Sequence, residues 1–140
     1  MEREEKKDIA KLLSEGKAVQ IFPQGYSMYP LFIPGRDEAV IIPADSGKLR
    51  RGDVVLYRRE GGLLVLHRLR RRTEEGLYFA GDNQTQEEGP LKPEQVIGVL
   101  AAFVRKGHRV SVRNPVYRLV SLMWMELMPV RGLLRALLRR

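Results

Sequence analysis

The sequence contains no cysteine and only two histidines, and both shortages limit the chemistry available to it. Without cysteine there can be no disulfide framework, no thiolate zinc site and no cysteine nucleophile. No window reaches the ~18–20 uninterrupted apolar residues of a membrane-spanning helix. The charged start, Met1 to Asp8, lacks the apolar core of a signal peptide. We therefore expect a cytoplasmic protein.

The net charge of +8 is distributed unevenly along the 140 residues. Residues 1–104 carry 16 Lys/Arg and 16 Asp/Glu, which cancel, whereas residues 105–140 carry nine Lys/Arg and Glu126 as their only acid. A basic end on a neutral body indicates an anionic partner for that end, such as lipid head groups, nucleic acid or an acidic protein.

The pattern of apolar residues and turns predicts a mainly β fold. We expect a small, strongly bent, barrel-like antiparallel sheet with an N-terminal helix and a C-terminal helical appendage. Residues 84–95 are polar, contain Pro90 and Pro93, and are expected to form a loop. The expected helix covers residues 2–15, and the expected strands cover 17–23, 38–42, 54–57, 63–71, 77–80, 96–104 and 109–112.

The C-terminal residues 114–140 read as a basic amphipathic helical tail. Asn114 followed by Pro115 is typical of a helix start, and Pro129 would end or kink the first helix. After it, leucines line one face and Arg131, Arg135 and Arg139 the other.

Two partners for this tail stay open. It could bind an anionic membrane peripherally, on the inner face, or it could pack on the β-domain or on a second copy of the chain. Nucleic acid is not expected, because the sequence has no helix-turn-helix pattern and no aromatics interleaved with the basic residues.

Residues 25–30, Gly-Tyr-Ser-Met-Tyr-Pro, place a serine where the backbone must bend sharply. Gly25 permits a positive φ, and Pro30 fixes φ and ends regular strand pairing. Ser27 could therefore be presented to a cleft as a nucleophile, although serines in Gly/Pro bends are more often turn residues.

A serine nucleophile needs a base, because a hydroxyl at its ordinary pKa attacks poorly. Strand alternation places His67 on an apolar face with Leu63, Val65 and Leu69. On the residues alone it is either a base or a core histidine bonded to a backbone carbonyl. His108 lies in an expected hairpin turn and should be exposed.

Four motifs occur in order: Gly-x-Ser-Met-x-Pro at 25–30, Gly-Asp-Val-Val at 52–55, His-Arg at 67–68 and Gly-Asp-Asn at 81–83. Together they resemble the serine-protease clan that contains the type I signal peptidases and the self-cleaving phage and SOS repressors. The His-Arg pair resembles the archaeal and endoplasmic-reticulum branch of signal peptidases, which has histidine where the usual bacterial enzyme has lysine. The resemblance covers roughly residues 17–104.

This resemblance implies a serine protease domain over residues 1–113, followed by the tail. Ser27 matches the family nucleophile, and its backbone N–H would be one oxyanion donor. His67 matches the general base, which later gives its proton to the leaving amine. The implied mechanism needs no metal or cofactor.

The acid that orients the histidine stays open. In the histidine branch it lies a few residues after the Gly-Asp-Asn turn, where Glu87 and Glu88 are the candidates and Glu88 has the better spacing. Asp82 is the alternative, because its turn lies close to the catalytic pair in this family. By itself, Asp82 could simply close a turn through its side chain.

The sequence departs from the family in four places. Signal peptidases usually have Ser-Gly before the nucleophile, but this chain has Gly25-Tyr26, so a hydroxyl that assists the oxyanion in the bacterial type is missing. Repressor-type members also read Gly-x-Ser-Met. The family's Gly-Asp after the first motif is split by Arg36, the third acid is a glutamate if it is Glu88, and the membrane-spanning anchor is absent.

We therefore expect a serine endopeptidase of the signal-peptidase type, which hydrolyses a peptide bond in an extended peptide or leader segment bound as a strand beside Ser27. One alternative is a protease-like module that binds a peptide or partner without cutting it. A self-cleaving regulator is the other, although the 26 residues before Ser27 leave little room for a DNA-binding domain.

Overall fold

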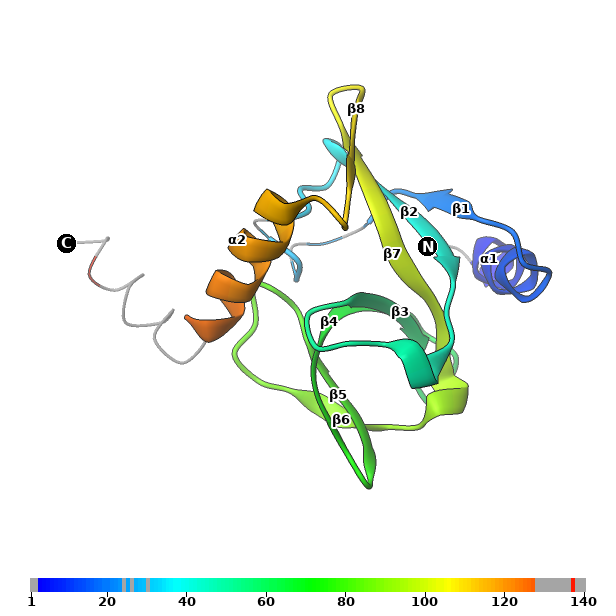
Figure 1. The fold of residues 1–140 in the computed structure, drawn as a ribbon. Coiled ribbons are helices and arrows are strands. Elements are labelled where there is room, and N and C mark those ends of the chain that lie inside the picture. The colour runs from blue at the N-terminus through cyan, green and yellow to red at the C-terminus, as the bar shows by residue number, and fades with distance from the viewer. Residues whose placement is uncertain (1–2, 24, 26, 30, 128–136, 138–140) are drawn as a thin grey trace.

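The computed structural model describes residues 3–23, 25, 27–29, 31–127 and 137 of the chain. As predicted, the fold is mainly β, with one short helix near each end of the described chain (Figure 1). In chain order the elements are α1 (Arg3–Ser14), β1 (Val19–Ile21), β2 (Asp37–Pro43), η1 (Ser46–Lys48), β3 (Val54–Arg58), β4 (Leu64–Thr73), β5 (Gly76–Ala80), β6 (Glu88–Leu91), η2 (Pro93–Gln95), β7 (Val96–Arg105), β8 (His108–Ser111) and α2 (Pro115–Glu126).

All eight strands belong to one antiparallel sheet with the order β1-β2-β7-β3-β4-β5-β6, and β8 also pairs with β7. The sheet is strongly bent but not closed, since β1 and β6 lie at its two ends (Figure 1). One side of β1 therefore remains an edge of the sheet, and this edge runs into the loop that carries Ser27.

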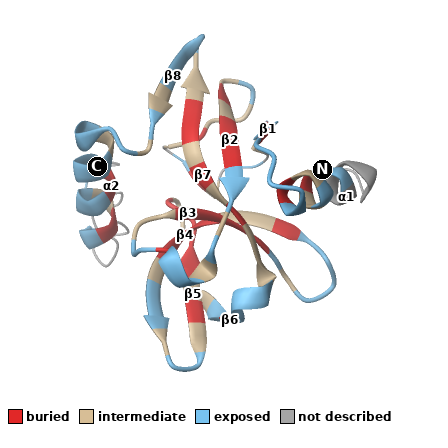
Figure 2. Ribbon diagram, turned by 45° about the vertical axis from the view of Figure 1, so that its right-hand side comes forward, coloured by how far each residue is buried: buried red, intermediate tan, exposed pale blue. Residues whose placement is uncertain are grey.

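Strand β3 is buried on both faces, which explains its uninterrupted apolar run. Val54 and Leu56 point into one core, and Val55 and Tyr57 point into the other. Figure 2 shows buried segments within β2, β3, β4, β5 and β7. The sheet thus has a core on each side, and the polar side chains in the middle of β4, His67 and Arg68, are removed from bulk water.

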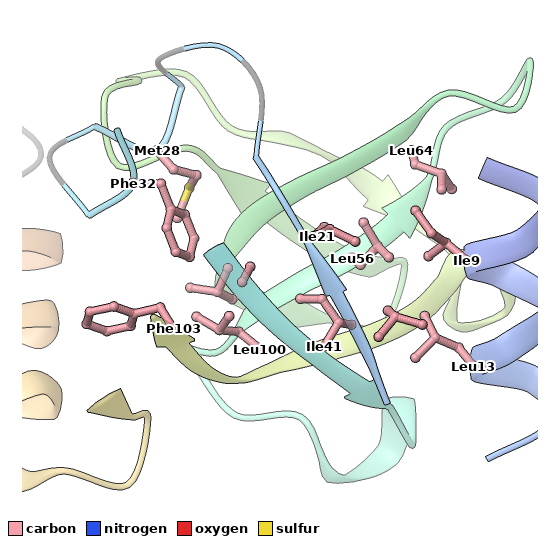
Figure 3. Packing of buried hydrophobic residues seen from close by; sticks show 13 residues of the cluster. Ile9, Leu13, Ile21, Met28, Phe32, Ile41, Leu56, Leu64, Leu100 and Phe103 are labelled. Atoms are coloured by element: carbon pink, nitrogen blue, oxygen red, sulfur yellow. The ribbon is translucent and has the colours of Figure 1, made fainter. Parts of the chain in front are cut away.

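The larger core joins α1 to the inner strands. Ile9 and Leu13 point from α1 toward Ile41 and Leu56, and Met28 and Phe32 lie toward the other end of the cluster (Figure 3). Since Met28 follows Ser27 directly, burial of its side chain helps to hold the serine loop against the sheet. The smaller core contains Leu49, Val55, Tyr57, Leu69, Leu77, Phe79 and Leu91.

The loop predicted over residues 84–95 is wrong in part. Glu88–Leu91 pairs with β5 as β6, and Pro93–Gln95 forms the short helix η2. The prediction failed here because Pro90 counted against a strand. Proline is excluded from central strands but tolerated in an edge strand such as β6, because not every N–H there takes part in the ladder.

Helix α2 begins as predicted, with the Asn114 carboxamide oxygen accepting the N–H groups of Val116 and Tyr117 at 2.9 and 3.2 Å. It packs at the opposite end of the sheet from α1 in both views (Figures 1 and 2). The predicted kink at Pro129 and most of the second helix over 130–140 lie outside the described residues.

Candidate active site

Ser27 lies in the loop after β1, and this loop is fastened to the turn that follows β5. The carbonyl oxygen of Ser27 accepts the backbone N–H of Asn83 at 2.8 Å. The approach is so close that a Cβ on Gly81 would lie 2.2 Å from the same oxygen. Glycine at position 81 is therefore required for the backbone contact, and Gly25, with φ of 76°, makes the bend before the serine.

His67 projects from β4 toward this loop. His67 pairs with Val55 of β3 in the hairpin closed by the Glu60-Gly61-Gly62 turn. The imidazole is 4% exposed, and its Nε2 lies 3.2 Å from Oγ of Ser27. The structure thus brings the two predicted partners, 40 positions apart in the chain, within hydrogen-bond reach.

The other imidazole nitrogen meets a tyrosine hydroxyl. Nδ1 of His67 lies 3.2 Å from Oη of Tyr57, and this hydroxyl donates to Oε1 of Glu88 at 2.5 Å. The second carboxylate oxygen of Glu88 accepts from Nε of Arg59 at 2.6 Å. A continuous chain of contacts therefore runs from Ser27 through His67 and Tyr57 to Glu88 and Arg59.

The proton positions in this chain follow from its charges. Burial raises the pKa of Glu88, but hydrogen bonds from Arg59 and Tyr57 outweigh burial and hold the pKa below its ordinary value. Glu88 is therefore a carboxylate that can only accept. Burial and the Glu88 charge raise the pKa of Tyr57 far above its ordinary value, so its single proton stays on the oxygen and points to Glu88.

With its proton committed to Glu88, the Tyr57 oxygen can only accept from His67. Nδ1 of His67 must then carry the imidazole proton, which leaves a lone pair on Nε2 facing Ser27. Burial, supported by the Arg59 charge, lowers the pKa of His67 to about 4, although the Glu88 and Asp82 charges oppose this. The imidazole is neutral at pH 7, in the tautomer that can accept the serine proton.

Asp82 lies close to the site but makes its bonds elsewhere. Its two carboxylate oxygens each accept from the Arg68 guanidinium at 2.7 Å, and both side chains are almost fully buried. Arg68 also donates to the carbonyl of Gly52 at 2.8 Å. Through its backbone, Asp82 accepts from Nε1 of Trp124 at 2.7 Å. Asp82 therefore holds the turn against which the serine loop rests, and it does not orient His67 directly.

The contacts of the remaining predicted candidates distinguish those that reach His67 from those that do not. Glu87 accepts from Nε of Arg71 at 3.0 Å and is not part of the chain that reaches His67. Glu88 reaches the histidine only through Tyr57. His108 is exposed at the start of β8, as predicted. The alternative of His67 as a core histidine bonded to a backbone carbonyl does not match its contacts, which are both to side-chain oxygens.

Asp37, which stands one residue late for the family's Gly-Asp motif, is buried and anchors the far end of the serine loop. It accepts from Arg36, from Nε of Arg105 at 2.8 Å and from the backbone N–H of Ile33 at 2.8 Å. Burial raises the pKa of Asp37, but the hydrogen bonds from Arg36 and Arg105 outweigh it and lower the pKa. Arg105 also donates to the carbonyl of Leu31 at 2.6 Å, so this ion cluster fixes residues 31–37.

A cleft of about 410 Å³ opens at Ser27 and His67. A second hollow, along residues 83–89, shares Arg59, His67 and Gln84 with it, so the two hollows adjoin at these side chains. The side chains that make the first cleft largely apolar are Ile21, Met28, Phe32, Leu56, Leu64 and Leu66.

Sequence reasoning missed two residues, Tyr57 and Arg59. Tyr57 was assigned only to a strand, yet hairpin pairing places it on the same face as His67, displaced by two residues from the directly opposite Val55. That register was available from the sequence. No local signal pointed to Arg59, whose role depends on β6 approaching the hairpin.

The described part of the chain contains no group of three or more His, Asp or Glu side chains placed to hold a metal ion. Nor does any of its helices combine the length and apolar character that crossing a bilayer requires.

A scan against protein-family models and a search of curated proteins find no match for this chain. The resemblance to signal peptidases therefore remains a prediction from the four sequence motifs.

Proposed function

We propose that this protein is a serine endopeptidase of the signal-peptidase type. Ser27 is the nucleophile and His67 the general base. The observation that carries the proposal is the 3.2 Å approach of Nε2 of His67 to Oγ of Ser27, beside an open cleft and in the proton-accepting tautomer. Tyr57 and Glu88 take the place of a directly bonded acid.

The reaction follows from these contacts. As Oγ of Ser27 attacks the scissile carbonyl carbon, its proton passes to Nε2 of His67, and the carbonyl becomes an oxyanion next to the Ser27 backbone N–H. The imidazolium then gives that proton to the leaving amine, which completes an acyl-enzyme ester. Water attacks the ester, His67 takes its proton, and the released serine recovers a proton from His67.

The hydrogen-bonded chain from His67 through Tyr57 to Glu88, called the relay below, stabilises the charged form of the buried base. A histidine whose pKa is about 4 is fully available as an acceptor at pH 7, but its charged form is costly. The imidazolium keeps its Nδ1–H bond to Tyr57, whose hydroxyl is polarised by the Glu88 carboxylate. The positive charge that develops on His67 during attack is thus stabilised by the negative charge of Glu88, which lies on the other side of the Tyr57 hydroxyl.

The substrate would bind as an extended peptide strand. β1 is an end strand of the sheet, and its free edge leads toward Ser27, so a peptide can pair along it by backbone hydrogen bonds. The apolar lining of the adjacent cleft favours small or apolar side chains in the residues that precede the cut.

Reaction with a fluorophosphonate, which loses fluoride as it phosphonylates the oxygen of an activated serine, tests the assignment. We expect a single adduct on Ser27, located by mass spectrometry of the digested protein. His67→Ala should abolish it, and His108→Ala, which removes the exposed histidine, should leave it unchanged.

A protease-like binding module is the second candidate, favoured by the lack of direct contact between His67 and a carboxylate in the described residues. It predicts no adduct on Ser27 while an apolar peptide still binds the cleft. An adduct on Ser27 that persists in His67→Ala would contradict the proposed base instead.

A further inference from the structure

Helix α2 has two faces of different character, and only one of them is covered by the β-domain. The covered face carries Met125 and Ser121, which are buried, and Tyr117, whose ring packs against Phe103 with centroids 5.6 Å apart. Trp124 reaches from the same side to the carbonyl of Asp82. This face accounts for how the helix is held, and the opposite face takes no part in these contacts.

The opposite face is apolar and exposed. Its side chains follow helical spacing at i, i+3, i+4, i+7 and i+11, so they form one continuous stripe along the helix. Soluble monomers rarely expose a contiguous apolar patch of this kind without a use for it. The stripe consists of Val116, Leu119, Val120, Met123 and Leu127, which are 70%, 60%, 59%, 56% and 40% exposed.

A groove lined by arginines runs along one flank of this helix. It has a volume of about 430 Å³, and four of its arginines make no ion pair within the described residues: Arg50, Arg109, Arg113 and Arg118. A fifth, Arg51, is paired with Glu126 at 2.7 Å. The single acid in the lining, Asp53, already accepts the backbone N–H of Arg50 at 2.8 Å.

The arginines come from separate segments: the loop between β2 and β3, β8, the turn before α2, and α2 itself. Folding gathers like charges here at a cost in repulsion, which an anionic partner would offset. The apolar stripe and the arginine groove share one helix, with Leu122, 40% exposed, lining the groove on the side next to the stripe.

We propose that the apolar stripe and the arginine groove together form a docking surface for an anionic lipid bilayer. The stripe lies among the acyl chains at the head-group boundary, and the arginines contact lipid phosphates. This combination of an apolar face with basic residues beside it is what interfacial membrane helices use. Below, the stripe and the groove together are called the α2 surface.

Charge complementarity selects this occupant over a second copy of the chain. Two copies joined through the α2 surface would bring two arginine clusters toward one another, with Asp53 as the single acid that lines each groove. A bilayer containing anionic lipid instead supplies both the apolar interior and the negative head groups. Each arginine near such a surface contributes ~1 kcal/mol to binding.

Sedimentation of the full chain with vesicles tests this proposal. We expect binding to vesicles of phosphatidylcholine mixed with phosphatidylglycerol, a decrease in that binding as salt is raised, and little binding to phosphatidylcholine alone. Arg113→Gln/Arg118→Gln should weaken binding roughly thirtyfold, at about 1 kcal/mol for each charge. Leu119→Gln/Met123→Gln, which removes apolar area, should weaken it roughly tenfold or more.

A matched control separates the α2 surface from net charge. Lys48→Gln/Arg58→Gln removes the same number of positive charges from exposed positions outside the groove and should bind almost as the unaltered protein does. All these side chains are exposed, so melting temperatures should stay unchanged.

Three results would overturn the proposal. The control could weaken binding as much as the arginine variant, which would make attraction a property of net charge. The leucine–methionine variant could convert a dimer to a monomer while vesicles bind no protein, which would assign the stripe to a second copy. Inorganic pyrophosphate could bind through Arg113 and Arg118 while vesicles do not, which would make the groove a site for a soluble phosphate compound.

Discussion

The hydroxyl of Tyr57 donates to the carboxylate of Glu88 across 2.5 Å, and this bond sets the proton position on the neighbouring histidine. Because the tyrosine proton is directed to Glu88, the tyrosine oxygen accepts from Nδ1 of His67. In the usual catalytic triad a carboxylate bonds the histidine directly. Here the neutral hydroxyl of Tyr57 lies between His67 and Glu88, and the carboxylate acts on the histidine by orienting and polarising that hydroxyl.

Replacing Tyr57 by phenylalanine tests this relay. The ring, stacked on Phe79 with centroids 4.4 Å apart, should keep its packing, but Nδ1–H of His67 would lose its acceptor. Leaving a buried donor unpaired costs about 1–3 kcal/mol, so phosphonylation of Ser27 by the fluorophosphonate should slow roughly ten- to hundredfold. Tyr78→Phe, which removes an exposed hydroxyl, should react at the unaltered rate, and equal rates in both variants would show that Tyr57 serves packing alone.

The pH dependence of this phosphonylation tests the state of His67. The base works only when neutral, and burial holds its pKa at about 4 instead of the ordinary 6.5. Protonation occurs below the pKa, so the phosphonylation rate should stay nearly constant from neutral pH down to about pH 5 and fall as the pH passes through the pKa of His67. A fall centred near pH 6.5 would mean that the imidazole is exposed to water before it reacts.

The buried ion pair between Arg68 and Asp82 should contribute to stability more than to chemistry. Asp82→Asn leaves a buried guanidinium without its charge partner, and removing one member of such a pair costs about 3–5 kcal/mol. Urea unfolding should report this loss, whereas Glu87→Gln, in the exposed pair with Arg71, should leave the midpoint nearly unchanged. If Asp82→Asn unfolds at the same urea concentration as the unaltered protein, the pair does not fasten the turn below the serine loop.

Gly81→Ala tests how closely that turn must approach the serine. The added Cβ would meet the Ser27 carbonyl oxygen at 2.2 Å, so the loop has to move away from His67. We expect a loss of about 1–3 kcal/mol in stability and a slower reaction of Ser27 with the fluorophosphonate. At Gly47 the same change meets its nearest atom at 3.4 Å, and Gly47→Ala should affect neither property. An unaltered rate of phosphonylation in Gly81→Ala would show that the loop tolerates displacement.

The sequence predicted the sheet well because its strands are marked by local signals. The double-glycine turn at 61–62 fixes the β3–β4 hairpin, and alternation on β4 places His67 and Arg68 on opposite faces. The same register could have identified Tyr57, since a residue two positions from Val55 shares the histidine face. Strand β6 was missed because its residues, Glu-Gly-Pro-Leu, carry no strand pattern of their own.

The contact between Ser27 and His67 had no local signal at all. It was expected only from the order of four motifs that resemble a family. In the structure it depends on the Ser27 carbonyl meeting Asn83 and on the absence of a side chain at Gly81. Such a contact joins segments that no periodicity links, so it becomes visible only when the chain is folded. The division of α2 into a covered and an exposed face was also not predictable, because a single apolar run does not reveal which face of a helix a sheet will cover.

Nitrogen-15 spectroscopy of the imidazole of His67 is the most direct test of the account, because it reports which ring nitrogen carries the proton. The expected spectrum at pH 7 is that of a neutral ring protonated at Nδ1, with an Nε2 signal that shifts in Ser27→Ala and an Nδ1 signal that does not. A proton on Nε2, or an imidazolium at pH 7, would contradict the account. Ser27 would then face an N–H donor, and Nε2 could not accept the proton of its hydroxyl.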